Sequence, residues 1–217
     1  MVALEYTAVI LLGYCLGAIP FGLVVGRLTK GIDIREYGSG KTGFANVLRS
    51  AGWKAGLLTL LTDAGKGAVP VLISWVVLHS HAAQVAAALA AMAGHNWPIY
   101  TRFRGGRGVS TFVGGMLAMY WPIGLVCGPG VGLGTAALTR YMSLGSILVA
   151  VSSLLVMLVM VLLETQPKAY LVYAAVGGGL ILFQHRDNIQ RLRTGTERRL
   201  GERADKREAS SPGRMKD

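Results

Sequence analysis

The sequence is poor in charge and in cysteine, and both shortages narrow the class of protein. Only 15% of its 217 residues are charged and 52% are hydrophobic, whereas a soluble domain carries about 25% charged residues. The two cysteines, Cys15 and Cys127, form no disulfide framework, and both are expected to be buried. No cluster of His, Cys, Asp and Glu has metal-ligand spacing, so we expect no metal and no other cofactor. The composition favours one all-α integral-membrane domain over residues 1–201.

Acidic residues are scarcer than basic ones, and the positions of the basic residues indicate their role. The chain has 22 Lys and Arg residues and 11 Asp and Glu residues. Six of the basic residues fall in 27–54, three in 102–107 and ten in 185–217. Such clustering in loops between apolar segments is the positive-inside pattern of membrane proteins. We therefore expect a lipid bilayer as partner and no nucleic acid. If the tail instead bound nucleic acid, deleting 202–217 would abolish function; we expect it to leave activity nearly intact.

Five apolar segments are long enough to cross, or nearly cross, a hydrocarbon core of about 30 Å. They are residues 5–28, 56–79, 82–100, 143–164 and 168–185. A further apolar stretch, 109–138, is too long for one crossing, and Gly128-Pro129-Gly130 predicts a break within it. We expect two short helices there, at about 109–122 and 125–139. We expect about seven transmembrane helices, with the N-terminus outside and the C-terminus and the basic loops in the cytoplasm. Five transmembrane helices and one re-entrant hairpin would satisfy the positive-inside rule equally well. Residues 202–217 are expected to form a disordered cytoplasmic tail.

Three polar stretches fall on the predicted cytoplasmic face, and the first runs from Tyr37 to Arg49. Its glycines let backbone N–H groups turn toward one point, as in phosphate-binding loops. The residues expected to bind phosphate are Gly38, Gly40, Lys41, Thr42, Gly43, Asn46 and Arg49. The stretch is not a Walker A motif, because Arg35 stands where that motif needs glycine. The alternative is a flexible loop with incidental charge.

The second and third stretches add a basic turn and a histidine. The second runs from Gly94 to Gly108 and joins a membrane helix to the N-terminus of the next, which suits an anion. Its candidate binding residues are His95, Asn96, Arg104, Gly105, Gly106 and Arg107. The third runs from Gln184 to Glu197, and its His185 and Asn188 share a helix face at a spacing of three.

Two charged residues, Asp63 and Lys66, lie within the second predicted span. Charges at that depth need a partner or a polar cavity. A structural ion pair and a place beneath the site are equally supported. Together with the interrupted stretch 109–139, this pair also allows a different function, a small-anion or phosphate-ester transporter.

In their order, spacing and common side, the three stretches resemble the PlsY family, the bacterial acyl-phosphate:glycerol-3-phosphate acyltransferases. The resemblance covers Gly17 to about Gly201. It implies a seven-helix enzyme of the bacterial inner membrane, with its active site facing the cytoplasm. It also implies transfer of a fatty acyl group from acyl-phosphate to the 1-hydroxyl of glycerol 3-phosphate, which yields lysophosphatidic acid and phosphate. The catalytic residues that it implies are Ser39, His185, Asn188 and Glu197.

The sequence departs from the family pattern at two places. Phe44-Ala45 stands where Ala-Thr is frequent, so a hydroxyl is missing, and Arg107 stands where Lys is frequent. The first departure is expected to change the local geometry, and together the two are expected to alter the kinetics within the same family resemblance. The general base is either His185 or the substrate's own phosphate. A Ser39–His185–Glu197 triad with an acyl-serine is a third mechanism.

Overall fold

The computed structural model describes residues 2–202 and 204–206, and these are almost entirely helical. The described part contains no β-strand, only an isolated antiparallel bridge between Tyr37 and Lys206. The elements are α1 (Val2–Ala18), α2 (Phe21–Lys30), η1 (Ile34–Glu36), α3 (Phe44–Ala51), α4 (Trp53–Leu78), α5 (His81–Asn96), η2 (Ile99–Thr101), α6 (Val109–Met119), α7 (Trp121–Leu125), η3 (Val126–Leu133), α8 (Gly134–Thr139), α9 (Met142–Leu162), α10 (Lys168–Gln184) and α11 (Arg186–Arg193). The expectation of an all-α protein is confirmed.

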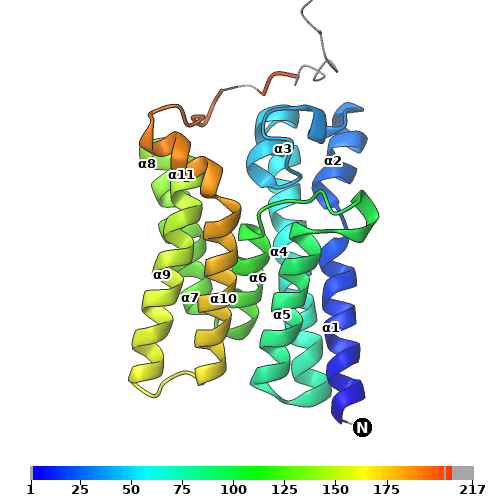
Figure 1. The fold of residues 1–217 in the computed structure, drawn as a ribbon, viewed down its shortest axis with the longest axis vertical. Helices are drawn as coiled ribbons and strands as arrows, with labels where there is room; N and C mark the ends of the chain where they lie inside the picture. Colours follow the sequence, from blue (N-terminus) through cyan, green and yellow to red (C-terminus); the bar gives the residue numbers. More distant parts are fainter. Residues whose placement is uncertain (1, 203, 207–217) are drawn as a thin grey trace, which may run out of the picture.

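The long helices lie side by side in one bundle, with the start of α1 at one end and α2, α3 and α11 at the other (Figure 1). Four helical segments of the described chain are long and apolar enough to cross a membrane: Ala3–Lys30, Trp53–Leu78, Trp121–Thr139 and Met142–Leu162. Helices α6 and α10 are shorter and also apolar. The number of crossings and the side on which each end lies stay predictions.

The structure divides 109–139 within a few residues of the predicted boundary between helices 109–122 and 125–139, but the predicted break near Gly128-Pro129-Gly130 is wrong. The helix ends at Tyr120, whose backbone is extended, and not near Gly128-Pro129-Gly130. Residues Trp121–Thr139 then run as one continuous helical segment, with Pro129 inside the π-helical turn η3. Pro129 has no N–H to donate, and the wider i→i+5 register of a π-turn accommodates a ring that would clash in an α-helix. The first predicted segment is also divided, because α1 ends at Ala18 and α2 starts after Pro20.

Small residues determine how closely the helices approach one another. A Cβ on Gly17 of α1 would overlap the backbone of Ala91 in α5, and one on Gly67 of α4 would overlap that of Thr111 in α6. Such contacts are typical of membrane helices. Cys127 is buried as expected, whereas Cys15 is exposed, because α1 turns that side outward.

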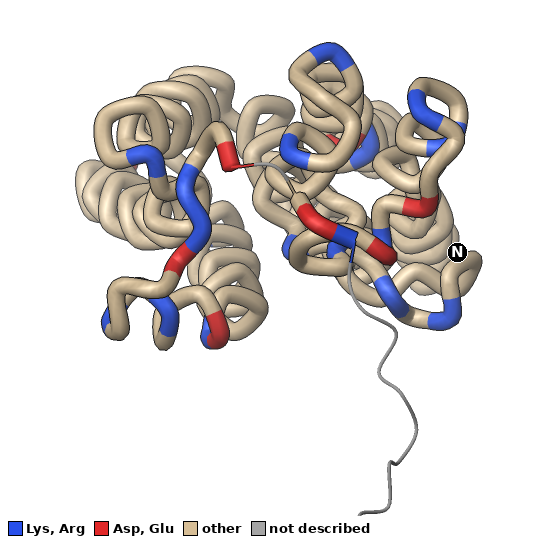
Figure 2. The backbone as a smooth tube through the Cα atoms, turned by 90° about the horizontal axis from the view of Figure 1, so that it is seen from above, with Lys and Arg blue, Asp and Glu red and all other residues tan. Residues whose placement is uncertain are grey.

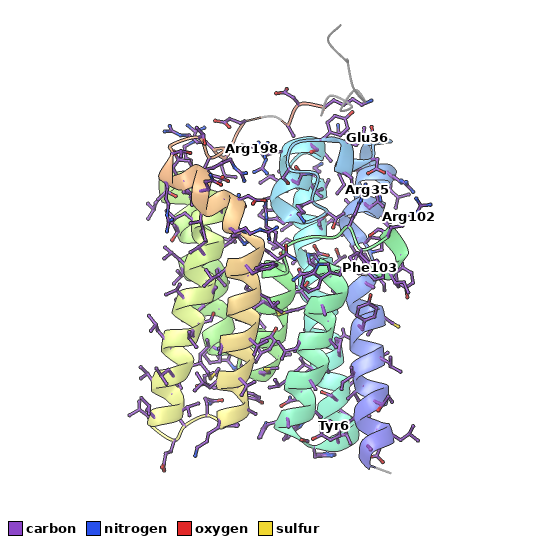
Figure 3. The ribbon with its side chains drawn as sticks, in the orientation of Figure 1. Tyr6, Arg35, Glu36, Arg102, Phe103 and Arg198 are labelled. Atoms are coloured by element: carbon purple, nitrogen blue, oxygen red, sulfur yellow. The ribbon has the colours of Figure 1, made fainter. Side chains whose placement is uncertain are left out.

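Charged residues gather at the end of the bundle that carries α2, α3 and α11, and Figure 2 marks them by colour on the backbone seen from above. Arg35, Glu36 and Arg198 lie at this end, whereas Tyr6 lies at the opposite end (Figure 3). The three polar stretches of the sequence therefore meet at one end of the molecule. Residues 203 and 207–217 of the predicted tail lie outside the described residues.

Candidate functional site

A cavity of about 280 Å³ opens between α4, α6, η3 and α9. Its polar end combines side chains from all three polar stretches, namely Ser39, Lys41, Arg107 and His185. The rest of the wall is mostly apolar and includes Leu60, Leu61, Val113, Leu117, Pro129, Leu133 and Val149. Leu61 and Leu133 are also 60% and 39% exposed on the outside of the bundle. The cavity is therefore polar at one end and reaches the apolar outer surface at the side.

The first polar stretch is held in place by Asn46. Its side-chain Nδ2 donates to the carbonyls of Ile34 (2.9 Å), Tyr37 (3.2 Å) and Lys41 (2.9 Å), and its Oδ1 accepts from the Ser39 N–H (3.0 Å). The side chain is 2% exposed, so all of these bonds are within the protein. Asn46 therefore shapes the loop, and Ser39 and Lys41 extend from it to the cavity.

The turn after α5 packs on the end of that helix. Gly106 N–H donates to the His95 carbonyl at 3.0 Å. A Cβ on Gly105 would overlap that same carbonyl, and one on Gly106 would overlap the His95 ring. Gly108, with φ of 81°, lies against the Asn96 side chain. These glycines, together with His95 and Asn96, thus position Arg107 at the start of α6. The exposed Arg104 does not line the cavity.

The third stretch places a histidine at the cavity and a buried polar group behind it. His185 lies between α10 and α11, and its Nδ1 bonds to the Ile181 carbonyl at 2.8 Å. Because a carbonyl only accepts, Nδ1 carries the proton and Nε2 is left as the acceptor of the neutral ring. Asn188 Nδ2 donates to Glu197 at 2.7 Å, while Asn188 Oδ1 is buried without a partner.

Glu197 does not complete a triad with Ser39 and His185. Its two oxygens accept from Asn188 (2.7 Å) and Arg191 (2.8 Å), and the His185 Nδ1 that a triad would need is bonded to Ile181. Glu197 instead fastens the segment after α11 back onto that helix. The hydrogen bonds of the acyl-serine mechanism are therefore not formed.

Two cations, Lys41 and Arg107, line the polar end, and Arg49 lies close enough to repel Arg107 without lining the cavity. None of the ion pairs in the described chain involves Lys41, Arg49 or Arg107. Burial, and then repulsion from Arg191, lowers the pKa of Arg107 to about 10. Burial and neighbouring arginines likewise lower the pKa of Lys41 and of Arg49. Uncompensated positive charge of this kind is stabilised when an anion binds.

Arg107 is further fixed by its backbone partner. Its Nε donates to the Gln184 carbonyl at 3.2 Å, at the end of α10. The bond uses one donor of the planar guanidinium and leaves the two terminal nitrogens for another group. The substitution of Arg for the frequent Lys thus adds a contact between the α5–α6 turn and α10.

Beneath the polar end, Asp63 and Lys66 form a buried ion pair. The two charged atoms are 2.9 Å apart, and both side chains are less than 5% exposed. Lys66 also donates to the carbonyl of Ile19 at 3.0 Å, where α1 is interrupted before Pro20. Asp63 and His95 line the cavity, with His95 Nδ1 3.7 Å from Asp63. Asp63 thus forms part of the cavity wall, whereas Lys66 does not line the cavity and ties α4 to the end of α1.

Sequence reasoning did not identify every polar group at the cavity. Ser110 and Ser146 also line it. Ser110 lies in the first turn of α6, directly after the basic turn, and that position was a usable signal. Ser146 lies one turn into α9 and nothing in its neighbourhood distinguishes it from other helical serines. Conversely, Thr42, Gly38 and Gly40 belong to the first loop without lining the cavity.

Comparisons with known proteins agree with one another. A model of the family described as glycerol-3-phosphate acyltransferase matches residues 7–195. The "Glycerol-3-phosphate acyltransferase 3" of Dehalococcoides mccartyi is 43% identical, over 94% of this chain and 100% of that one. The "Glycerol-3-phosphate acyltransferase" of Cereibacter sphaeroides is 44% identical, over 94% of this chain and 93% of that one.

Solved structures of the same description share the fold. The crystal structure of PlsY (YgiH), described as an integral membrane glycerol 3-phosphate acyltransferase in its glycerol 3-phosphate form, superposes with a TM-score of 0.83 at 37% identity. The match covers 90% of this chain and 96% of that one. Its lysophosphatidic acid form gives a TM-score of 0.81. This multi-pass membrane protein therefore belongs to the glycerol-3-phosphate acyltransferase family and is an acyltransferase.

Proposed function

We propose that this protein transfers a fatty acyl group from acyl-phosphate to the 1-hydroxyl of glycerol 3-phosphate, on the cytoplasmic side of a bacterial inner membrane. The observation that carries the proposal is the cavity itself. One end presents uncompensated cations for phosphate, and the other is apolar and reaches the lipid-facing surface. A donor with a phosphate head and an acyl tail fits both ends at once. The family's printed name supplies the acceptor.

Different residues of the site bind the two substrates in this reaction. Lys41 and Ser39, from the first loop, hold the phosphate of the donor at the mouth of the apolar cavity. Arg49 and Arg107 hold the phosphate of glycerol 3-phosphate, and the unpartnered Oδ1 of Asn188 accepts a hydrogen bond from a glycerol hydroxyl. Binding both substrates in this way brings the hydroxyl to the acyl carbonyl, and positioning supplies much of the rate.

The chemical step is a direct acyl transfer. The hydroxyl oxygen forms a bond to the acyl carbon, the bond from that carbon to the phosphate oxygen breaks, and the phosphate leaves with its electron pair. The proton passes to His185 Nε2 or to a substrate phosphate, both of which are unprotonated acceptors. Direct transfer is favoured over an acyl-serine because Glu197 and His185 are bonded elsewhere.

A purified-protein assay tests the proposal. The protein in detergent or lipid is given palmitoyl-phosphate and glycerol 3-phosphate, and lysophosphatidic acid and phosphate are measured, with palmitoyl-CoA as the control donor. We expect product from acyl-phosphate alone, and a loss of at least about 100-fold in kcat for His185→Ala, as is usual when a general base or positioning group is removed. Ser39→Ala is expected to lower activity as well.

Two results would count against the proposal. Folded wild-type protein that makes no lysophosphatidic acid from any donor would overturn it. Product formed from palmitoyl-CoA but not from palmitoyl-phosphate would leave the family assignment and replace the donor. The transporter alternative gains no support from the comparisons, and vesicles that take up glycerol 3-phosphate without making product would be needed to revive it.

A further inference from the structure

The wall that α6 contributes to the apolar cavity ends at a single side chain. The residues of α6 that line the cavity are Val109, Ser110, Val113 and Leu117, all on one face of the helix. Val109 follows Arg107 at the polar end, so Leu117 is the deepest of the four. No later residue of α6 lines the cavity. Leu117 is therefore the point at which this wall ends.

Leu117 is held there by a glycine of the following helix. A Cβ placed on Gly124 of α7 would lie 2.7 Å from Cδ2 and Cγ of Leu117. The leucine thus packs directly on the α7 backbone at Gly124. On the opposite wall the lining residues end nearer the polar end, at Gly128 of η3, which faces Val113, and at Val149 of α9, which faces Gly132.

The depth of the cavity is comparable to the length of a common acyl chain. Eight residues separate Val109 from Leu117, which at about 1.5 Å per helical residue is about 12 Å. A hydrocarbon core of about 30 Å contains two leaflets of chains, so one chain accounts for about 15 Å. A chain of that length, anchored by its phosphate at the polar end, meets Leu117 before it is fully accommodated, while a distinctly shorter chain does not.

We propose that Leu117 limits the length of acyl chain that the cavity holds, and so sets the preference of the enzyme among acyl donors. The inference rests on the proposed use of acyl-phosphate. Long chains bind with their ends displaced through the side opening between Leu61 and Leu133. Shortening the side chain at position 117 deepens the cavity, and enlarging it makes the cavity shallower.

A competition between donors measures this preference. Palmitoyl-phosphate and decanoyl-phosphate are supplied together with glycerol 3-phosphate, and the ratio of the two lysophosphatidic acids is determined by mass spectrometry. Since each additional buried methylene changes binding about fourfold, Leu117→Ala is expected to raise the palmitoyl-to-decanoyl ratio at least about fourfold. Leu117→Phe is expected to lower it by a similar factor. The ratio is internal to each sample, so a variant that folds in lower yield still reports it.

The matched control is Leu155→Ala in α9. Leu155 is 57% exposed on the outside of the bundle and does not line the cavity, so the same change of side chain there should leave the ratio unaltered. Ratios equal to wild type in active Leu117 variants would overturn the inference and leave the proposed function standing. Absence of product from wild-type protein would overturn both. A shift in Leu155→Ala equal to that in Leu117→Ala would assign the effect to the surrounding lipid, against the inference.

Discussion

At the scale of single residues, the site depends on groups that are buried with a defined protonation state. His185 is 2% exposed and bonded through Nδ1 to a backbone carbonyl. Burial, reinforced by the charge of Arg107, lowers the pKa of His185 to about 4. The ring is consequently neutral at physiological pH in the free enzyme, with Nε2 ready to accept a proton.

The lowered pKa of His185 predicts how stability changes with pH. The ordinary pKa of histidine, about 6.5, applies to the unfolded chain, which takes up a proton at higher pH than the folded chain does. As pH falls from about 6.5 toward 4, the contribution of His185 to the free energy of unfolding therefore decreases, by up to about 3 kcal/mol. We expect wild-type protein to lose more thermal stability than His185→Gln between about pH 7 and about pH 5.

Thermal unfolding in detergent at the two pH values provides the measurement. His79→Gln, an exposed position at the end of α4, is the control and should behave like wild type. Equal pH-dependent losses in wild type and His185→Gln would show that the histidine is protonated alike in the folded and unfolded states, contrary to this expectation.

The types of residue and their order in the sequence identified much of the site, but they did not identify the role of each residue. The polar stretches predicted Ser39, Lys41, Arg107 and His185, and the structure brings these four to one cavity, although their roles stay predictions. Asn46 and Glu197 are bonded to protein groups, a distinction that depends on where the backbone places carbonyls and arginines. Ser146 reaches the cavity only through the packing of α9, which no local pattern reveals.

At the scale of elements, the turn between α5 and α6 is tightly constrained. Gly105 and Gly106 lie so close to His95 that neither position has room for a Cβ. The turn also carries Arg107, so the distance between the turn and α5 determines where the Arg107 guanidinium lies. The sequence predicted an anion-binding Gly-Gly turn, but the structural reason for the glycines is the close approach of the turn to the backbone and the ring of His95.

Replacing one of these glycines is expected to displace Arg107. Gly106→Ala must push the turn away from the His95 ring, and small displacements of binding groups reduce catalysis by large factors. We expect kcat/KM for glycerol 3-phosphate to fall at least about tenfold. Steady-state kinetics on the purified variant would measure it. Gly65→Ala, at a position in α4 with nothing within 4 Å of the added carbon, is the control; equal effects of the two changes would contradict the explanation.

The element that sequence reasoning misplaced is η3. Gly-Pro-Gly ordinarily ends a helix, and that expectation placed a break near residue 128 where the helix continues, although the predicted division between 122 and 125 lies close to the observed one at Tyr120. The π-turn keeps the helix continuous, and Gly128, Pro129 and Gly132 line the cavity. The low helix propensity of Gly-Pro-Gly correctly indicated an irregular place in the chain. Packing of η3 against α6 and α9 determines that the irregularity is a widened helical turn and not a break in the helix.

At the scale of the whole molecule, the segment after α11 joins the two sides of the polar end. Leu200 and Arg140 exchange two hydrogen bonds, of 2.7 and 2.8 Å, at the start of α9. Farther along, the Asp205 carbonyl accepts from Gly38 N–H (3.1 Å), and Lys206 lies 3.5 Å from Glu36. In Figure 1 this segment crosses from α11 to the top of α2 and α3.

These tail contacts are few and weak, which predicts a modest effect of truncation. The described part of the tail accepts one backbone hydrogen bond from Gly38, donates one to the Arg49 carbonyl of α3 and makes one exposed ion pair, each worth about 1 kcal/mol or less. We expect protein ending at Gly201 to keep kcat/KM within about tenfold of the full chain, since the cavity is complete without the tail. The assay with palmitoyl-phosphate measures it. A loss beyond about 100-fold in a folded truncation would assign the tail a direct part in catalysis.

The opening of the cavity beside Leu61 and Leu133 has a consequence for how the enzyme responds to its substrates. The proposed acyl donor reaches the site by lateral diffusion within the membrane, so its effective concentration is its mole fraction among lipids. Glycerol 3-phosphate arrives from water, where its molarity matters. The rate thus depends on the mole fraction of the acyl donor in the membrane and on the molarity of glycerol 3-phosphate in water. A growing membrane dilutes the acyl donor and leaves the concentration of glycerol 3-phosphate unchanged.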